Sequence, residues 1–375
     1  MSQDFVRRLP GHERDVRSTW LHEIHIEPVL FMLLSCVVAY GLVILFSAVG
    51  ENEAMFRAQL TRMALAFAAL AVAAQLPPRL YIAWAPFIYV GGVVLLVLVL
   101  LFGVVVNGSR RWLDVVGIVR FQPSELMKIA VPMAVAWYFH DRALPPSFKD
   151  VCVALAIALV PAGLIMMQPD LGTGILVATA GLAVVLLAGV QWRWIFAAGA
   201  AFAAAAPVLW YTLQDYQRQR ILTLFDPESD PLGAGWNIIQ SKTAIGSGGV
   251  FGKGLTAGTQ SHLDFLPEAQ TDFIIAVIAE ELGLVGIVML LTLYVFVIGR
   301  GLFLAASAES TFGRLLSGAL VLTFFVYIFV NMAMVSGLLP VVGVPLPLVS
   351  YGGTSAITLM AGFGIIMAIR THKAW

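Results

Sequence analysis

A dense group of carboxylates stands directly before one of the long apolar runs of this 375-residue chain. Residues 262–283 read HLDFLPEAQTDFIIAVIAEELG, and no charged residue follows until Arg300. The five acidic residues of this segment are Asp264, Glu268, Asp272, Glu280 and Glu281. Ionisable groups at or inside a membrane span are costly and indicate a functional site. A carboxylate placed there can act as a general base.

Asp272 is our candidate for that base. We expect it in the first turn of a helix that spans the membrane from residue 272, with Thr271 as the cap, because the positive end of a helix dipole keeps a carboxylate ionised. Glu268 lies four residues earlier and would share this helix face, orienting the base or helping to hold a divalent metal. Glu280 and Glu281 lie about 12 Å deeper by helical rise. One of them could line a polar cavity, or both could pair with neighbouring spans.

A second segment collects positive charge. Residues 107–128 read NGSRRWLDVVGIVRFQPSELMK and contain Arg110, Arg111, Arg120 and Lys128. Arginine and lysine bind phosphate groups, so an anionic ligand is one explanation, and lipid-headgroup contact is the other. Trp112 could pack on a sugar or lipid face, or serve as an interfacial anchor. Glu125 precedes Lys128 by three residues, so on a helix the two can form an ion pair.

Three further turns combine glycine with polar residues. Residues 244–260, AIGSGGVFGKGLTAGTQ, do not form a nucleotide-binding phosphate loop, because Ser247 and Gly254 stand where that pattern needs glycine and serine or threonine. We expect a hairpin or re-entrant segment in which Lys242 and Lys253 can contact an anion. In QPDLGTG, Asp170 can cap a helix or take part in a site. In PLPLVSYGGTS, Ser350 can cap the last span or take part in substrate binding, since Gly352 and Gly353 would let another backbone or a ligand come close.

The composition is that of a membrane protein with many spans. Hydrophobic residues make up 60% of the chain, charged residues 12%, and the mean hydropathy is +0.90; soluble domains are about 25% charged. A bilayer core needs roughly 20 apolar residues as a helix. The sequence predicts about ten spans, at residues 29–49, 58–76, 81–103, 124–139, 151–167, 171–189, 193–211, 272–299, 315–338 and 350–369. The predicted fold is therefore an all-α polytopic membrane domain.

The distribution of Lys and Arg predicts the orientation. The positive-inside rule places both termini, residues 1–28 and 370–375, in the cytoplasm. A large loop between spans seven and eight, residues 212–271, then lies outside, together with the smaller loops at 104–123 and 339–349. The mixed charges before the first span argue against a cleavable signal peptide. The formal net charge of zero identifies no partner, and no nucleic-acid partner is expected. Cys36 and Cys152 are expected in the core.

Five motifs occur in a fixed order: FQPSE, QPDLGTG, GSGG, FLPEAQTDFIIAVIAEELG and PLVSYGGTS. With ten spans and a large seventh loop, they resemble the SEDS family (shape, elongation, division and sporulation) of bacterial membrane proteins, from about residue 29 to 370. The stretch GTQSHLDFLPEAQTDF is more similar to the elongation branch, RodA, than to the division branch, FtsW.

The resemblance implies a peptidoglycan glycosyltransferase of the cytoplasmic (inner) membrane that polymerises lipid II on the outer face during cell elongation and rod-shape maintenance. It implies a class B penicillin-binding protein and other elongation-complex proteins as partners. It implies no nucleotide cofactor, and Mg²⁺ or Mn²⁺ is the candidate cation. The family's essential aspartate falls on Asp272, its tryptophan and basic residues on Trp112, Arg120 and Lys128, and a further aspartate on Asp170.

The chemistry agrees with these residue types. The acceptor sugar hydroxyl must lose a proton as it attacks the donor anomeric carbon, and a lipid pyrophosphate departs. A carboxylate base and a positively charged cradle serve these two needs. Two alternatives use the same features: a lipid II flippase, which would need polar residues along a path through the membrane, and a non-catalytic scaffold of the cell-wall synthesis complex.

Overall fold

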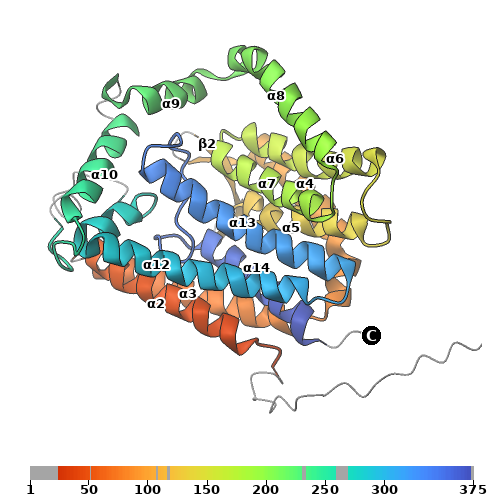
Figure 1. The fold of residues 1–375 in the computed structure, drawn as a ribbon, viewed down its shortest axis with the longest axis horizontal. Coiled ribbons are helices and arrows are strands. Elements are labelled where there is room, and N and C mark those ends of the chain that lie inside the picture. The colour runs from red at the N-terminus through yellow and green to blue at the C-terminus, as the bar shows by residue number, and fades with distance from the viewer. Residues whose placement is uncertain are drawn as a thin grey trace, which may run out of the picture.

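The fold was examined in a computed structural model that describes residues 24–50, 52–106, 109–115, 119–229, 234–258 and 269–372. Each of the ten predicted spans contains a helix (Figure 1). Their bounds are α2 Pro28–Val49, α3 Glu53–Gln75, α4 Pro78–Phe102, α5 Pro123–Phe139, α6 Phe148–Met166, α7 Leu171–Leu187, α8 Trp192–Thr212, α12 Ile274–Ala306, α13 Thr311–Val335 and α14 Thr354–Thr371. Within the described residues, seven of them, α2, α3, α4, α6, α12, α13 and α14, are long and apolar enough to cross a membrane. The chain is therefore an integral membrane protein.

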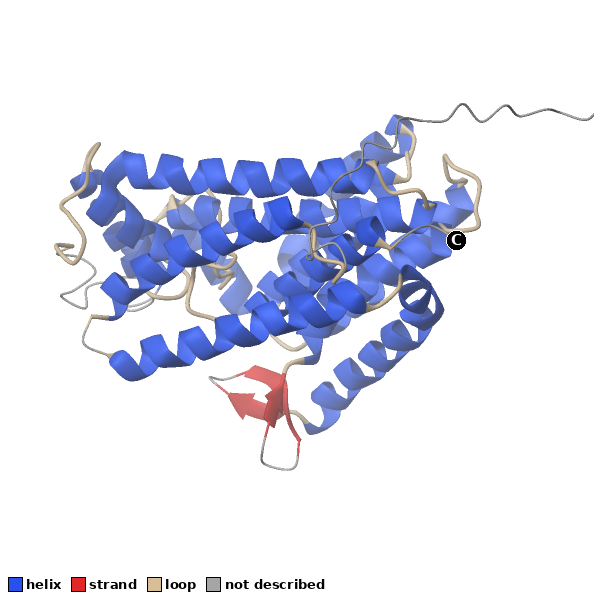
Figure 2. Ribbon diagram, turned by 90° about the horizontal axis from the view of Figure 1, so that it is seen from below, coloured by secondary structure: helices blue, strands red, loops and turns tan. Residues whose placement is uncertain are grey.

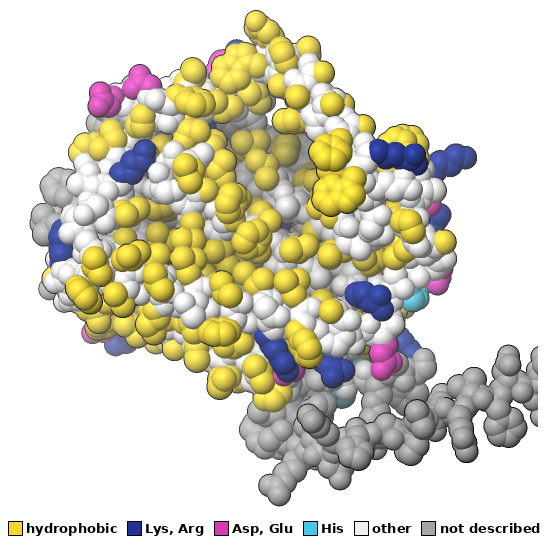
Figure 3. Space-filling view, viewed as in Figure 1, with side chains coloured by type: hydrophobic (Ala, Val, Ile, Leu, Met, Phe, Trp, Pro, Cys, Tyr) yellow, Lys and Arg dark blue, Asp and Glu magenta, His cyan; other side chains and the backbone are white. Residues whose placement is uncertain are grey.

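Small residues allow the helices of the bundle to pack closely. A Cβ atom at Gly364 of α14 would lie 2.4 Å from the Leu70 carbonyl oxygen of α3. Aromatic side chains fill the centre, where the Phe324 ring lies 5.7 Å from that of Tyr294 and 5.0 Å from that of Phe363. Apolar side chains cover most of the face in Figure 3, and charged ones lie mainly toward its edges. This surface suits lipid contact.

The prediction of an all-α fold is wrong in the loop between α4 and α5. Three strands form a small antiparallel sheet there: β1 Val104–Val106, β2 Ser109–Val115 and β3 Val119–Phe121 (Figure 2). In the register, Val105 faces Arg110, and Asp114 faces Arg120. Runs of β-branched valine favour strands, and the hydropathy window that finds spans does not detect strands of three residues.

Much of the predicted large loop is helical. It contains α9 Asp215–Phe225, the 3₁₀ helix η1 Pro227–Ser229 and α10 Ala234–Gly248. Figure 1 shows α8, α9 and α10 forming an arch that stands away from α13 before α10 returns to the bundle beside α12. Ser241 of α10 fixes this return by donating a hydrogen bond to the Val335 carbonyl at 2.9 Å.

Helix α12, in the predicted span 272–299, is not straight. It bends at Gly283, whose backbone angles of φ 66° and ψ −159° are not helical. The predicted re-entrant glycine segment packs on the bend through backbone hydrogen bonds, with Lys253 N donating to Glu280 O at 3.0 Å and Leu284 N donating to Gly249 O at 3.0 Å. The glycine segment therefore fixes the bend of the helix that follows Asp272.

Two smaller predictions are also wrong. Asp272 is not in the first turn of α12, because it lies in the turn 269–273 before the helix, and the N-cap is Phe273. Cys36 and Cys152 are free and exposed on the outside of the bundle, not in its core. Apolar neighbours in the sequence do not distinguish a core position from a lipid-facing position on a membrane helix.

Candidate functional site

The turn that carries Asp272 is held by the loop between α13 and α14. Asn331 of α13 is fully buried, and its Nδ2 donates hydrogen bonds to the carbonyls of Asp272 at 2.8 Å and Val344 at 2.7 Å. Tyr351 N donates to the Gln270 carbonyl at 2.8 Å. A Cβ atom at Gly343 would lie 3.6 Å from the Asp272 Oδ2 atom, so this carboxylate points at a glycine. The carboxylate is half-buried and rigidly placed.

Ser350 also helps to hold the turn of Asp272, and it is not a helix cap. Its hydroxyl accepts a hydrogen bond from Leu346 N at 2.8 Å and donates one to the Thr271 carbonyl, next to Asp272. The N-cap of α14 is Gly353. The expected capping role of Ser350 is therefore wrong, because the chain stays in a turn for three more residues before the helix begins.

Asp170 is a cap, as one reading of its motif predicted, and it also joins three segments. Its Oδ1 accepts a hydrogen bond from Thr173 N at 3.2 Å in the first turn of α7. Its Oδ2 accepts one from Gln122 Nε2 at 3.3 Å and lies 3.9 Å from an Arg111 guanidinium nitrogen. Arg111 also donates to the Pro169 carbonyl at 2.6 Å. Asp170 is buried, so this network anchors the sheet to α5 and α7.

The segment 342–344 brings Asp170 and Asp272 to one end of the bundle. A Cβ atom at Gly172 of α7, two residues after Asp170, would lie 2.5 Å from the Val342 carbonyl oxygen. On its other side, Gly343 faces the Asp272 carboxylate. The start of α7 and the turn of Asp272 therefore both approach segment 342–344, although they are far apart in the sequence.

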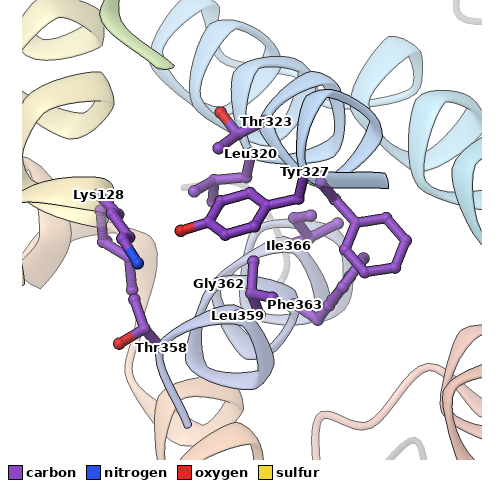
Figure 4. Close-up of a pocket in the computed structure, with 11 residues that line it drawn as sticks. Lys128, Leu320, Thr323, Tyr327, Thr358, Leu359, Gly362, Phe363 and Ile366 are labelled. Atoms are coloured by element: carbon purple, nitrogen blue, oxygen red, sulfur yellow. The ribbon is translucent and has the colours of Figure 1, made fainter. Parts of the chain in front are cut away.

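Lys128 and Glu125 form the ion pair that their spacing predicted. The Lys128 Nζ atom lies 2.6 Å from Glu125 Oε1, and both side chains are buried. Lys128 also lies 5.1 Å from the centroid of the Tyr327 ring and lines a cavity of about 20 Å³, room for one water molecule, between α5, α13 and α14 (Figure 4). Glu125 Oε2 is buried and accepts no hydrogen bond from the described residues. The pair connects to the site because Tyr327 packs with Val344.

For some of the remaining predicted site residues, the structure describes only the backbone or nothing. The backbones of Arg110 and Arg120 lie in β2 and β3, and their side chains, like all of Glu268, lie outside the described residues. Trp112 is half-buried on β2 and, by strand alternation, lies on the opposite face from Arg111. Lys242 of α10 is exposed, and its Nζ would lie 2.7 Å from a Cβ atom at Gly337, at the end of α13.

The deeper acids of the opening segment have structural partners. Glu280 is fully buried and lies 2.6 Å from the Lys253 Nζ atom. Glu281, also fully buried, accepts a hydrogen bond from Ser47 of α2 at 2.7 Å. Pairing with a neighbouring span is confirmed for Glu281, whereas Glu280 pairs with Lys253 of the glycine segment, so Lys253 neutralises a carboxylate.

An apolar cavity of about 260 Å³ adjoins segment 342–344. It lies between α7, α9, α13 and residues 339–342, with Ile175, Ile221 and Val330 among its walls. Gln217 and Arg220 of α9 supply polar groups at one wall. The site thus combines a carboxylate, an arginine and an apolar compartment.

Sequence reasoning did not identify Asn331 and Gly343. An asparagine inside a 25-residue apolar helix is a signal that could have been read, because a buried amide in a membrane helix needs hydrogen-bond partners. Gly343 has no comparable signal, since its role depends on the turn before α12. No group of three or more His, Cys, Asp or Glu side chains suited to a metal ion occurs within the described part of the chain.

Comparison with known proteins places the chain among bacterial cell-wall proteins. The sequence profile of the FtsW, RodA and SpoVE family, described as "Cell cycle protein", matches residues 27–374. The peptidoglycan glycosyltransferase MrdB of Escherichia coli K12 is 53% identical over 358 residues, which cover 95% of this chain and 96% of MrdB. A probable peptidoglycan glycosyltransferase FtsW of Trichlorobacter lovleyi is 36% identical, covering 91% of this chain and 92% of that protein.

Solved structures agree with the sequence comparison. A chain from a structure titled "Structural coordination of polymerization and crosslinking by a peptidoglycan synthase complex" superposes with a TM-score of 0.81 and 31% identity, covering 92% of this chain and 97% of that chain. The rod shape determining protein RodA of Thermus thermophilus superposes with a TM-score of 0.69 and 28% identity, covering 91% and 95% of the two chains. The chain is therefore a member of the FtsW, RodA and SpoVE family, the SEDS family of the sequence motifs.

Proposed function

We propose that this chain is a peptidoglycan glycosyltransferase that polymerises lipid II during cell elongation, with Asp272 as its general base. The observation that supports this assignment is the position of Asp272, whose backbone is held by Asn331 and whose carboxylate faces Gly343, next to the apolar cavity that Val342 and Arg220 line. Family membership and 53% identity to the glycosyltransferase MrdB support the reaction class. The general-base role of Asp272 rests on its geometry and on the family motif.

The reaction uses these groups as follows. The hydroxyl oxygen of the acceptor sugar forms a bond to the donor anomeric carbon, and its proton passes to the Asp272 carboxylate. The bond from that carbon to the lipid pyrophosphate breaks, and the electron pair leaves with the pyrophosphate. Attack opposite the leaving group inverts the anomeric centre. Asn331 and Ser350 hold the turn of Asp272, so no ordering of the base is needed during the reaction.

The charge of the pyrophosphate needs positive partners. Arg111 retains a side-chain exposure of 33% beside Asp170. We assign pyrophosphate binding to Arg111 with Arg110 and Arg120 of the same sheet, and we assign Lys242 to the outer edge of the site. Lys128 is buried against Glu125, so it would contact the substrate only if the substrate also reached Glu125, whose Oε2 atom accepts no hydrogen bond from the described residues.

A divalent cation fits the site only with help from the substrate. The described residues provide Asp272 alone at the base position, and Mg²⁺ commonly binds through one or two carboxylates together with substrate phosphates. We therefore propose that Asp272, with Glu268, would hold a Mg²⁺ or Mn²⁺ ion together with the substrate pyrophosphate. Such an ion supplies charge compensation for the departing pyrophosphate.

The apolar cavity explains how a lipid substrate is held near the base. Its walls, from α7, α9 and α13, suit the isoprenoid units next to the pyrophosphate, and Arg220 lies at the same wall. The lipid chain would enter beneath the arch of α8, α9 and α10. The sugar and peptide would then lie over segment 342–344 and the sheet, where Trp112 offers an aromatic face.

The site lies at the end of the bundle where α5, α7, α12 and α14 begin. We place this end at the outer face of the cytoplasmic membrane and both termini in the cytoplasm, because the short turns at the other end carry Arg79, Arg142, Lys149 and Arg314. We also propose a class B penicillin-binding protein as the partner that crosslinks the product.

Purified protein supplied with lipid II in detergent, alone and with the penicillin-binding protein, tests the assignment. We expect glycan polymer that persists in moenomycin, an inhibitor of classical transglycosylases. A flippase would instead scramble lipid II in liposomes without polymer, and a scaffold would do neither. The candidate base and the proposed pyrophosphate-binding arginines lie at one end of the bundle, which favours the enzyme over the flippase.

A further inference from the structure

A second charged cavity lies at the end of the bundle opposite to Asp272. Its volume is about 280 Å³, against about 30 Å³ for a water molecule in the liquid. It is enclosed by the turn between α3 and α4, the end of α5, the loop between α12 and α13, and the end of α14. Its polar lining residues are Arg79, His140, Glu309, Ser310, Arg370 and His372. The cavity takes no part in the proposed glycosyl transfer.

The walls of this cavity are preformed. Pro77 and Pro78 fix the backbone where α4 begins, and the Ser310 hydroxyl caps α13 by accepting a hydrogen bond from Gly313 N at 3.0 Å. Helices α13 and α14 approach closely there, since a Cβ atom at Gly313 would lie 2.7 Å from Ile369 Cγ2. A ligand would therefore meet an ordered surface and would not have to organise it.

The side chains of the cavity favour an anion. Two helices, α4 and α13, begin there, and four, α3, α5, α12 and α14, end there, so the helix dipoles do not by themselves attract an anion and the basic side chains must do so. Two arginines then face one carboxylate, that of Glu309, and no ion pair joins Arg370 to any residue that the structure describes. His140 and His372 each add one further ring nitrogen, because His140 Nε2 lies 3.7 Å from Asp141 and His372 Nδ1 lies 3.0 Å from the Ala368 carbonyl. A guanidinium group matches phosphate oxygens with two parallel hydrogen bonds.

The rim of the cavity is apolar. Leu76 and Leu80, on either side of the turn between α3 and α4, are 39% and 42% exposed, and Phe303 of α12 is 58% exposed. We propose that the cavity binds a phosphate group and that its source is the headgroup of an anionic phospholipid, with the acyl chains on this apolar rim. Basic pockets between helices at the cytoplasmic end of membrane proteins bind such headgroups.

Native mass spectrometry of the purified full-length chain tests the proposal. The probes are dioleoyl phosphatidylglycerol, dioleoyl phosphatidylcholine with the same acyl chains, and inorganic phosphate. We expect phosphatidylglycerol to be retained preferentially and the Arg79→Gln/Arg370→Gln double variant to bind it about tenfold or more weakly. Arg314→Gln is the matched control, because Arg314 is exposed at the same end of the bundle and does not line the cavity.

A gain of binding provides a second test that misfolding cannot imitate. Glu309→Gln removes the one acidic lining residue and should strengthen phosphatidylglycerol binding roughly threefold. Displacement of phosphatidylglycerol by millimolar inorganic phosphate would assign the cavity to a soluble phosphate and overturn the lipid source. Equal phosphatidylglycerol binding by the double variant and the unchanged chain would overturn the phosphate site itself.

Discussion

Asp272 owes its position to groups that hold its backbone. Asn331 and Ser350 fix the carbonyls of Asp272 and Thr271, so the side chain can change without loss of the turn. Asp272→Asn should fold normally and lose roughly two to four orders of magnitude in lipid II polymerisation, because a general base is removed. Gel analysis of the glycan product and thermal stability in detergent measure the two effects.

Asp215→Asn is the control for this substitution, since Asp215 is an exposed acid on the arch at the same end of the molecule. It should polymerise at the rate of the unchanged chain. Near-normal polymer from Asp272→Asn, under conditions where Asp215→Asn is also active, would remove Asp272 from the catalytic role.

The proposed cation at Asp272 would make polymerisation sensitive to chelation. EDTA should abolish polymer formation, and Mg²⁺ or Mn²⁺ should restore it. Paramagnetic resonance of Mn²⁺ with lipid II should report a bound ion that disappears in Asp272→Asn. Full activity in EDTA would show that the positive side chains alone neutralise the leaving group.

A double variant can distinguish a role of Lys128 in activity from its role in the ion pair with Glu125. Lys128→Met alone leaves the buried Glu125 carboxylate uncompensated, which costs about 3–5 kcal/mol. Glu125→Gln combined with Lys128→Met removes both charges and should recover most of the lost thermal stability. We expect polymerisation to stay low in the double variant. If the double variant is as active as the unchanged chain, the pair serves only to pack α5 against α13.

At the scale of elements, the bend in α12 joins the glycine segment to the base. Gly283 has φ 66° and ψ −159°, which other residues rarely adopt, and a Cβ atom there would lie 2.4 Å from Gly252 N. Gly283→Ala should therefore destabilise the protein by about 3 kcal/mol or more and reduce polymerisation. Thermal unfolding followed by size-exclusion fluorescence measures the loss.

Gly299 in the same helix supplies the control. A Cβ atom at Gly299 meets nothing within 4 Å, so Gly299→Ala should leave stability unchanged or raise it. Equal unfolding temperatures for the two alanine variants would contradict the strain assigned to Gly283.

The sequence predicted helices well and their local geometry poorly. Apolar length located a helix in each of the ten predicted spans, because the bilayer imposes that length whatever the tertiary contacts. The same signal does not register β1 and β3, three residues each, or the bend at Gly283, which follows from contact with a glycine segment about thirty residues earlier.

In the candidate site, contacts within one helix were predictable from the sequence, and contacts between distant segments were not. The pair of Glu125 and Lys128 was predictable because their spacing on one helix decides it. The approach of Asp272 to Gly343 was not, because it depends on how a turn and a loop 70 residues apart meet across α13. Ser350 was given the wrong role for this reason: its partner is the Thr271 carbonyl, not its own helix.

At the scale of the whole molecule, α12 offers a surface to a membrane partner. Val288, Val295 and Phe296 are 51%, 65% and 57% exposed on it, and its neighbour α13 exposes Phe325 and Phe329. A single transmembrane helix of the penicillin-binding protein could pack along this face. Because α12 begins one residue after Phe273, contact there could shift the turn of Asp272 and activate the enzyme through a change of population.

Cysteine crosslinking locates the partner helix. Cys36 and Cys152 are exposed and would first be replaced by serine, to give a background without reactive thiols. Val288→Cys and Val295→Cys on α12 should then form disulfides with cysteines placed along the partner helix. Val90→Cys and Val94→Cys on α4, which are 57% and 52% exposed in the free chain, should not. Crosslinks that appear from α4 and are absent from α12 would place the interface on the other side of the bundle, where contact could not reach Asp272 through the bent helix.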